Sequence, residues 1–362
     1  SDKLTIATET SKASGTQAAV NASLIAGAGK DDITVNTSGA GTTTIDAGDG
    51  DDKVHITDRS EGVLTVNLGA GNDTFTSDVA IGAKDVIDAG AGVDTLLLKL
   101  VGSLNVGAFS NFDAFDAAGL ATSLDVNILA AKNNVTEFIS SATAGAGAAL
   151  LNIGANVGFR ATGDMGLTNT LTLTQKTGAA LTVTIDADET GSGNVDADAR
   201  SAKIDATNAT SVKAVFGTSY VESIDEEATA GDNVTTLNLT AAQATSVTVE
   251  SGGALSNNVL SVNGAKLATI TVTGDRVLDL TNTTTTSALT SVDASTSTGG
   301  LEFSLAGLKD GGSVKLGSGA DVITVTNASK LGGLESIQGF EKAAAVAVSE
   351  TATEEAIAAA IA

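Results

Sequence analysis

A nine-residue motif recurs four times near the start of the chain, and each copy begins 21 residues after the one before. The copies are AGAGKDDIT at 26–34, AGDGDDKVH at 47–55, LGAGNDTFT at 68–76 and AGAGVDTLL at 89–97. Each has the form x-G-x-G-x-D-x-Φ-x, in which Φ is an apolar residue. A fixed period of this length is typical of a solenoid in which each repeat forms one coil.

The residue types indicate how one coil is built. Glycine allows the positive φ of a tight turn, and the apolar residue two positions after the Asp begins an inward-facing strand. The residues between two motifs, such as 37–45 and 61–68, provide a second strand and a second turn. One coil cannot bury its apolar side alone, so we expect successive coils to stack in parallel, about 4.8 Å apart.

Composition supports this architecture and narrows the possible partners. The 362 residues include no Pro, which leaves the backbone donors free for a long hydrogen-bonded ladder, and no Cys for disulfides or thiolate metal sites. Trp is absent and Tyr220 is the single Tyr, so the core must come from Val, Ile, Leu and Ala. The net charge of −24 argues against nucleic acid and anionic membranes as partners, and it favours divalent cations or simply solubility.

The motif divides the chain into three predicted regions. Residues 1–100 carry the 21-residue period, 101–310 are rich in predicted strands without the motif, and 311–362 hold a fifth copy, LGSGADVIT, and a tail. No apolar run approaches the ~18 residues that span a bilayer, so membrane insertion is not expected. The chain shows no signal peptide and does not begin with Met, so we expect a processed product or a fragment.

The motif resembles the G-G-x-G-x-D-x-U-x nonapeptide of the repeats-in-toxin family, also called hemolysin-type calcium-binding proteins. The resemblance implies an all-β, right-handed parallel β-solenoid (a β-roll or β-helix) with several Ca²⁺ ions between stacked turns. This chain departs from the family pattern in two ways. The first Gly is Ala or Leu in every copy, and 12 residues separate the copies, so calcium turns are expected along one edge only.

The resemblance also implies which residues bind calcium, because Ca²⁺ prefers oxygen ligands. The motif Asp residues are the implied carboxylate ligands, Asp49 and Asp51 add turn carbonyls, and Asp46 and Asp88 are weaker candidates. The alternative is that these are ordinary Gly-Asp turns of a β-solenoid. The complete predicted metal set is Gly27, Gly29, Asp31, Asp32, Gly48, Asp49, Gly50, Asp51, Asp52, Gly69, Gly71, Asp73, Gly90, Gly92, Asp94, Gly317, Gly319 and Asp321.

In the middle region, alternating apolar and polar runs recur every 9 to 13 residues, for example TLTLTQ at 170–175 and ATITVTG at 268–274. Such runs fit either an antiparallel sandwich or a continuing solenoid. Few Asn-Gly or Asp-Gly turns separate them, which favours the solenoid. The pattern at 267–305 resembles calcium-dependent surface-layer proteins of Gram-negative bacteria, and this resemblance implies a two-dimensional lattice on the outer membrane.

An internal duplication supports a shared plan for the two motif-bearing ends. Segments 90–119 and 317–345 each run from a motif turn to a Phe–acid pair, Phe115-Asp116 and Phe340-Glu341. We expect the Phe residues to fill or cap the core. The acidic loop 186–199 fits an irregular calcium loop or a solvated loop equally, since Ala197 replaces the Glu of an EF-hand. The charge run at 220–234 is more typical of solvated surface or a short helix. The tail 349–362 predicts a short helix, either a solenoid cap or a secretion signal.

Nothing in the sequence indicates catalysis, and we predict that the protein is not an enzyme, with no catalytic or cofactor-binding residues. His55 is the only His, so Cys–His and multi-His centres are excluded, and we expect it to be an exposed strand residue. Sugar-degrading clefts usually carry Trp, Tyr and Arg, which are nearly absent.

These observations predict a secreted, calcium-dependent structural protein of the bacterial cell surface that assembles with copies of itself, using type I secretion. Outer-membrane lipopolysaccharide is the expected anchoring partner, through a region that the sequence does not identify. Calcium would drive folding after export. The alternative is a repeat segment of a secreted adhesin, or the carrier module of a larger toxin or enzyme.

Overall fold

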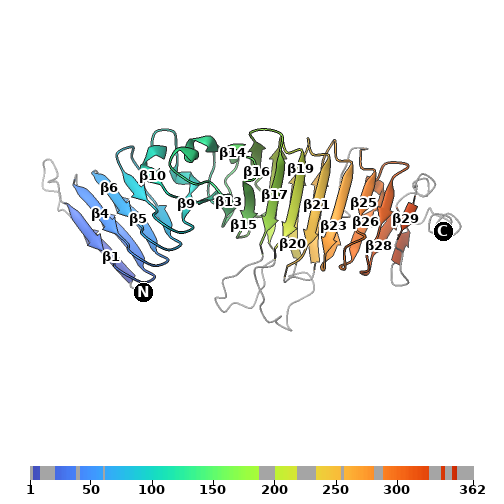
Figure 1. Ribbon diagram of the computed structural model, residues 1–362, viewed down its shortest axis with the longest axis horizontal. Helices are drawn as coiled ribbons and strands as arrows, with labels where there is room; N and C mark the ends of the chain where they lie inside the picture. The colour runs from blue at the N-terminus through green and yellow to red at the C-terminus, as the bar shows by residue number, and fades with distance from the viewer. Residues whose placement is uncertain are drawn as a thin grey trace. The chain divides into compact units, whose positions relative to one another are not determined.

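The computed structural model describes residues 3–8, 21–37, 41–59, 62–186, 200–217, 234–253, 257–280, 288–325, 336–338 and 345–348. These residues form an all-parallel β-solenoid, which confirms the predicted fold class (Figure 1). The right-handed sense of the coil stays a prediction, and the helix predicted at 349–362 lies outside the described residues. No described helix is long and apolar enough to cross a bilayer.

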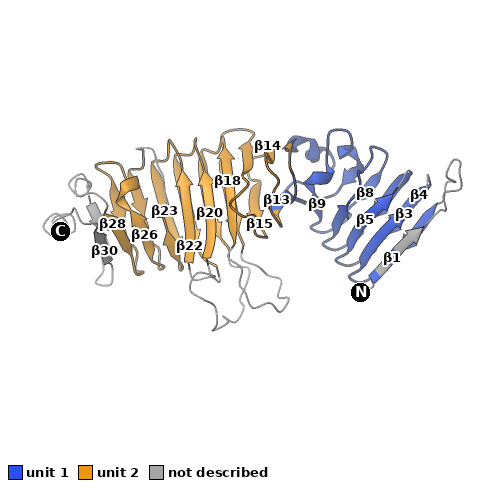
Figure 2. Ribbon diagram, turned by 180° about the vertical axis from the view of Figure 1, so that it is seen from behind, with its two compact units in different colours: residues 1–120, 124–139 blue, residues 121–123, 140–362 orange. Residues whose placement is uncertain are grey.

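The chain packs as two compact units (Figure 2). Unit 1 comprises residues 1–120 and 124–139, and unit 2 comprises residues 121–123 and 140–362. The region boundaries predicted at residues 100 and 310 were placed by where the motif occurs, not by how the chain packs. They stay a prediction.

In unit 1, two parallel sheets form opposite sides of each coil, and the chain alternates between them. The first sheet contains β1 (Lys3–Thr8), β3 (Asp32–Thr37), β5 (Lys53–Arg59), β7 (Thr74–Ser77), β9 (Thr95–Leu97), β11 (Ala114–Asp116) and β13 (Glu137–Ser140). The second sheet contains β2 (Ala22–Ile25), β4 (Thr42–Asp46), β6 (Val63–Asn67), β8 (Val86–Asp88) and β10 (Phe109–Ser110).

Unit 2 repeats this plan. One sheet contains β15 (Gly158–Ala161), β17 (Ala180–Ile185), β19 (Ser211–Phe216), β21 (Ser246–Ser251), β23 (Thr269–Gly274), β25 (Ser291–Asp293), β27 (Ser313–Lys315) and β29 (Ser336–Gln338). The other contains β14 (Ala149–Ile153), β16 (Leu171–Gln175), β18 (Ser201–Thr207), β20 (Val234–Thr240), β22 (Asn257–Asn263), β24 (Val277–Asp279), β26 (Leu301–Ser304), β28 (Val322–Val325) and β30 (Ala345–Val348).

The parallel pairing within unit 2 excludes the antiparallel sandwich that the sequence left open. The quoted alternating runs coincide with strands of the solenoid. Residues 98–131, between the motif coils and the alternating runs, are less regular. They include β12 (Ser123–Asp125) and the 3₁₀ helices η1 (Leu98–Leu100), η2 (Val106–Ala108) and η3 (Val126–Ala131). A fourth, η4 (Leu305–Gly307), follows β26. Sequence periodicity did not predict these short helices.

In the coils of unit 1 that carry the motif, the 21-residue period sets the register, so that strand residues next to the motif turns pair one repeat apart. Asp32 pairs with Lys53, Lys53 with Thr74, and Thr74 with Thr95. The apolar residue of every motif therefore stacks on the one before inside the coil, and none of the four has any exposed surface; they are Ile33, Val54, Phe75 and Leu96. A slip of one residue would turn this row toward solvent, so the pattern fixes the register.

Phenylalanine fills the interior where the coils become irregular. Phe75, Phe109 and Phe112 form successive ring contacts with centroids 6.4 Å apart, and Phe115 lies 6.1 Å from Phe138. All are fully buried. This confirms the predicted core role of Phe115, while its counterpart Phe340 lies outside the described residues.

The glycines of the motif turns are required for two separate reasons. Gly27, Gly48 and Gly69 have φ between 103° and 109°, a backbone conformation that residues with a side chain rarely adopt. A Cβ on Gly69 would also lie 1.7 Å from the carbonyl oxygen of Gly48, whereas a Cβ on Gly27 would meet nothing within 4 Å. Close stacking of the coils therefore adds a steric requirement that Gly27 does not share.

These two requirements can be separated by mutation. Gly27→Ala should be destabilised only by its positive φ, whereas Gly69→Ala should lose roughly 1–3 kcal/mol more of unfolding free energy through overpacking. Urea denaturation of both variants measures the difference. Equal losses would show that the turns are not packed against one another in this way.

Candidate metal centre

The motif turns connect the two sheets of unit 1 along one edge, and their backbones are hydrogen-bonded from coil to coil. The N–H of Asp49 donates to the carbonyl of Gly27 (2.9 Å), and the N–H of Ala70 donates to that of Gly48 (2.9 Å). In the opposite direction, Gly29 donates to the carbonyl of Asp49 (2.6 Å). The turns are thus held at the spacing of the sheets, as the one-edge prediction requires.

The motif Asp residues form a ladder beneath these turns. The N–H of Asp31 donates to Oδ1 of Asp52 (2.7 Å), that of Asp52 to Oδ1 of Asp73 (2.7 Å), and that of Asp73 to Oδ1 of Asp94 (2.8 Å). Each carboxylate therefore reaches back to the coil before it. We call Asp31, Asp52, Asp73 and Asp94 the aspartate ladder.

The ladder is buried, and three of its four carboxylates each leave one oxygen without a hydrogen bond. Asp52 and Asp73 are each 1% exposed, and Asp94 has no exposed surface. The Oδ2 atoms of these three residues accept no hydrogen bond. Burying a carboxylate without a partner for its charge is unfavourable, so a proton or a cation at these oxygens would stabilise the fold.

The titration of the ladder reflects this environment. Burial raises the pKa of the Asp73 and Asp94 carboxyls from 3.8 to about 6; the accepted backbone hydrogen bonds oppose the rise, and neighbouring Asp charges add to it. Burial likewise raises the pKa of Asp52, with contributions from the charges of Asp31, Asp51 and Asp49. Without a cation, Asp73 and Asp94 therefore keep their protons to a higher pH than an ordinary Asp does.

The donor chemistry fits a hard divalent cation. The unpartnered Oδ2 atoms supply one carboxylate oxygen per coil, and oxygen is the ligand that Ca²⁺ prefers. No group of three or more His, Cys, Asp or Glu side chains among the described residues is arranged to hold a metal ion. Six to eight ligands would therefore need turn carbonyls or water beside the ladder.

The doubled Asp residues of the first two motifs are not equivalent. Asp32 is exposed on β3, and Asp51 is exposed in the turn, where its Oδ1 accepts the N–H of Asn72 (2.8 Å). Asp31 and Asp52 are the buried members of the two pairs. The extra Asp in each pair thus adds charge near the ladder without joining it.

Three other predicted residues lie outside the ladder. Asp46 accepts a hydrogen bond from the amide of Asn67 (3.0 Å), and Asp88 accepts one from the N–H of Gly90 (3.2 Å) and another from the amide of Asn111 (2.6 Å). Asp49 is exposed in its turn. Their carboxylates already have partners or solvent, unlike the buried ladder oxygens.

The fifth motif is built differently. Asp321 is 2% exposed, burial raises its pKa, and its Oδ1 accepts the N–H of Leu301 (2.8 Å). The neighbouring coil thus presents Leu301 where the ladder presents an Asp. Gly317 and Gly319 do not adopt the left-handed φ of the first four motifs. A calcium site at Asp321 stays a prediction.

The acidic loops cannot be placed. Residues 187–199 and 218–233 lie outside the described residues, so calcium binding there stays a prediction. Asp186, which begins the first loop, contacts Arg160 (3.4 Å) through its carboxylate and accepts a hydrogen bond from Arg200 (2.9 Å) at its carbonyl.

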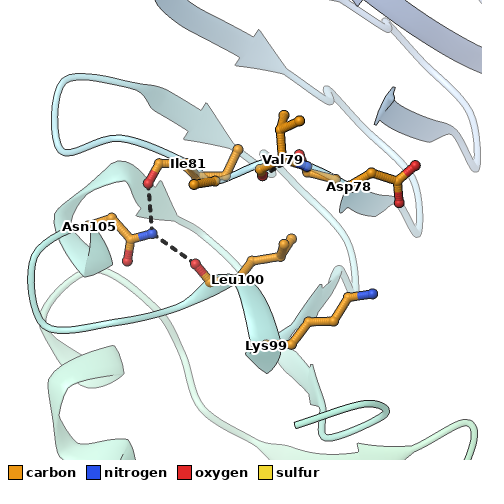
Figure 3. Close-up of a pocket in the computed structure, with 8 residues that line it drawn as sticks. Asp78, Val79, Ile81, Lys99, Leu100 and Asn105 are labelled. Atoms are coloured by element: carbon orange, nitrogen blue, oxygen red, sulfur yellow. Dashed lines mark hydrogen bonds between the residues drawn. The ribbon is translucent and has the colours of Figure 1, made fainter. Parts of the chain in front are cut away.

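His55 and a surface groove are the features of the described residues that most resemble parts of an active site. His55 is 38% exposed on the outer face of β5 and contacts Asp78 (3.1 Å), as expected of an exposed strand residue. A groove of about 390 Å³ lies between residues 77–81 and 99–105 (Figure 3). There the amide of Asn105 donates to the carbonyls of Ile81 (2.9 Å) and Leu100 (2.8 Å), which joins the two loops.

The raised pKa values predict how stability depends on pH when metal is absent. The neutral form is favoured in the fold, so this contribution to stability is complete below about pH 4 and is lost as the pH rises through about 6. Asp73→Asn should flatten this part of the profile, because Asn cannot ionise.

Urea denaturation between pH 4 and 7 in metal-free buffer measures the effect, with exposed Asp32→Asn as the control. A wild-type profile that Asp73→Asn does not flatten would contradict the assignment of the ladder as the titrating group.

Comparison with known proteins finds no matching family model, no matching curated protein and no matching solved structure, so the candidate site rests on its own geometry.

Proposed function

We propose that this protein is a calcium-dependent structural protein, whose solenoid folds fully only when Ca²⁺ neutralises the aspartate ladder. The observation that carries the proposal is the column of buried Oδ2 atoms of Asp52, Asp73 and Asp94, each without a hydrogen-bond partner. The motif's resemblance to the repeats-in-toxin family supports the same ion.

The protein's own groups define what calcium would supply. Backbone N–H groups orient Oδ1 of Asp52, Asp73 and Asp94, which leaves each Oδ2 without a hydrogen-bond partner. A bound Ca²⁺ would supply positive charge that offsets the mutual repulsion and the desolvation of these carboxylates when they are ionised. The free energy of binding then becomes folding free energy, because the unfolded chain lacks this alignment.

The proposed location follows from this coupling. Calcium is scarce in the cytosol and abundant outside the cell, so the chain would stay loosely folded before export and close afterwards. We therefore propose a secreted, cell-surface protein that assembles into a layer with copies of itself, anchored to lipopolysaccharide. The resemblance of 267–305 to surface-layer proteins supports this part of the proposal.

Removing calcium tests the folding step. Chelation at pH 7 should lower the melting temperature of unit 1 sharply, and Asp73→Asn should lower the number of calcium ions bound, as measured by isothermal titration calorimetry. Asp51→Asn changes the same charge at an exposed position and should leave that number unchanged. A melting temperature that is indifferent to calcium would contradict the proposal.

Imaging tests the assembly step separately. Negative-stain microscopy with and without millimolar calcium should show sheets or filaments only when calcium is present. Separate particles under both conditions would refute self-assembly and favour the carrier or adhesin alternative, whatever the calorimetry shows.

A further inference from the structure

A buried ion pair lies at the end of β5 that is remote from its motif turn. Arg59 meets Asp85 through two parallel contacts, Nη1 to Oδ1 (2.9 Å) and Nη2 to Oδ2 (2.8 Å), and the two side chains are 16% and 2% exposed. Asp85 also accepts the N–H of Leu64 at Oδ1 (2.9 Å) and that of Gly82 at Oδ2 (2.6 Å). Its carboxylate is thus fully partnered within the protein, unlike the ladder carboxylates.

The pair joins two consecutive coils at the edge opposite the aspartate ladder. Arg59 ends β5, the strand that begins directly after Asp52. Asp85 directly precedes β8, the strand that leads into the turn of Asp94. Because β6 and β8 pair in parallel from Thr65 and Val86 onward, the bond from Leu64 to Asp85 continues that register.

The loop before Asp85 explains why such a contact is needed. Between β5 and β6 the connection is short, at residues 60–62, whereas residues 78–85 separate β7 from β8. A longer loop leaves the start of the next strand less well fixed. A bidentate Arg–carboxylate pair has a defined geometry, so it fixes where β8 begins and therefore where the following motif turn lies.

We propose that Arg59 and Asp85 are positioning residues for the calcium turns: a metal-independent latch that sets the register of adjacent coils before calcium binds. This inference rests on the proposed function, because it assumes that the ladder binds calcium. The sequence offers a faint signal for it, since Arg59 is the only Arg in residues 1–139.

Calcium titration of Arg59→Gln tests the latch. We expect the calcium concentration at half-saturation to rise on the order of tenfold, because part of the calcium-binding free energy must now fix the register of the coils. The number of ions bound should stay that of the wild type. Arg59→Lys keeps the charge without the forked geometry and should restore only part of the affinity. Lys315→Gln, which breaks the exposed pair with Asp293 in unit 2, should change nothing.

A matched core variant separates positioning from general destabilisation. Ile87→Val removes one methylene group from the fully buried core at β8 without touching the pair. Hydrogen exchange of the Asp52 and Asp73 amides in metal-free protein should be faster in Arg59→Gln than in Ile87→Val, when the two are compared at equal overall stability.

The outcomes distinguish the two proposals. In one outcome the wild type responds to calcium, but Arg59→Gln and Ile87→Val raise the half-saturation concentration equally when they lose equal stability. The positioning role of Arg59 and Asp85 is then overturned, and the proposed function stands. If the wild type binds no calcium, both are overturned.

Discussion

The structure of unit 1 depends on one electrostatic constraint, which is a column of carboxylates buried one coil apart. Parallel stacking brings like charges within the range where repulsion and desolvation both raise pKa values, as at Asp73 and Asp94. The backbone bonds that orient the ladder cannot neutralise it. Burial and alignment of the carboxylates therefore oppose their ionisation, and this opposition is the physical basis of the proposed calcium dependence.

The two edges of the same coils resolve charge in different ways. At the motif edge the carboxylates of Asp52, Asp73 and Asp94 accept a backbone N–H at one oxygen, and the other oxygen has no hydrogen-bond partner among the described residues. At the other edge Asp85 has the Arg59 guanidinium and two backbone donors. The carboxylate at one edge is fully partnered, whereas the three carboxylates at the other edge each keep one oxygen without a hydrogen bond.

Much of this arrangement was predictable because it repeats. The period placed the glycine turns, the inward apolar row and the ladder residues, and β-alternation placed most strands of unit 2. The pairing of Arg59 with Asp85 was not predictable, because it depends on how the loop 78–85 folds. The sequence also could not say whether the extra Asp of each doubled pair, Asp32 or Asp51, adds a ligand or only charge, since that depends on how each side chain is turned. Nor did it show that Leu301 would stand beside Asp321.

The one-coil offset of the ladder bonds has a consequence for how such a chain can change over evolutionary time. Every bond from an Asp N–H to the next Asp joins equivalent positions, so duplicating or deleting a complete 21-residue repeat recreates the same contacts. Inserting a single residue in a strand would instead exchange its inner and outer faces. Length in this region can therefore vary freely by whole repeats and hardly at all within one.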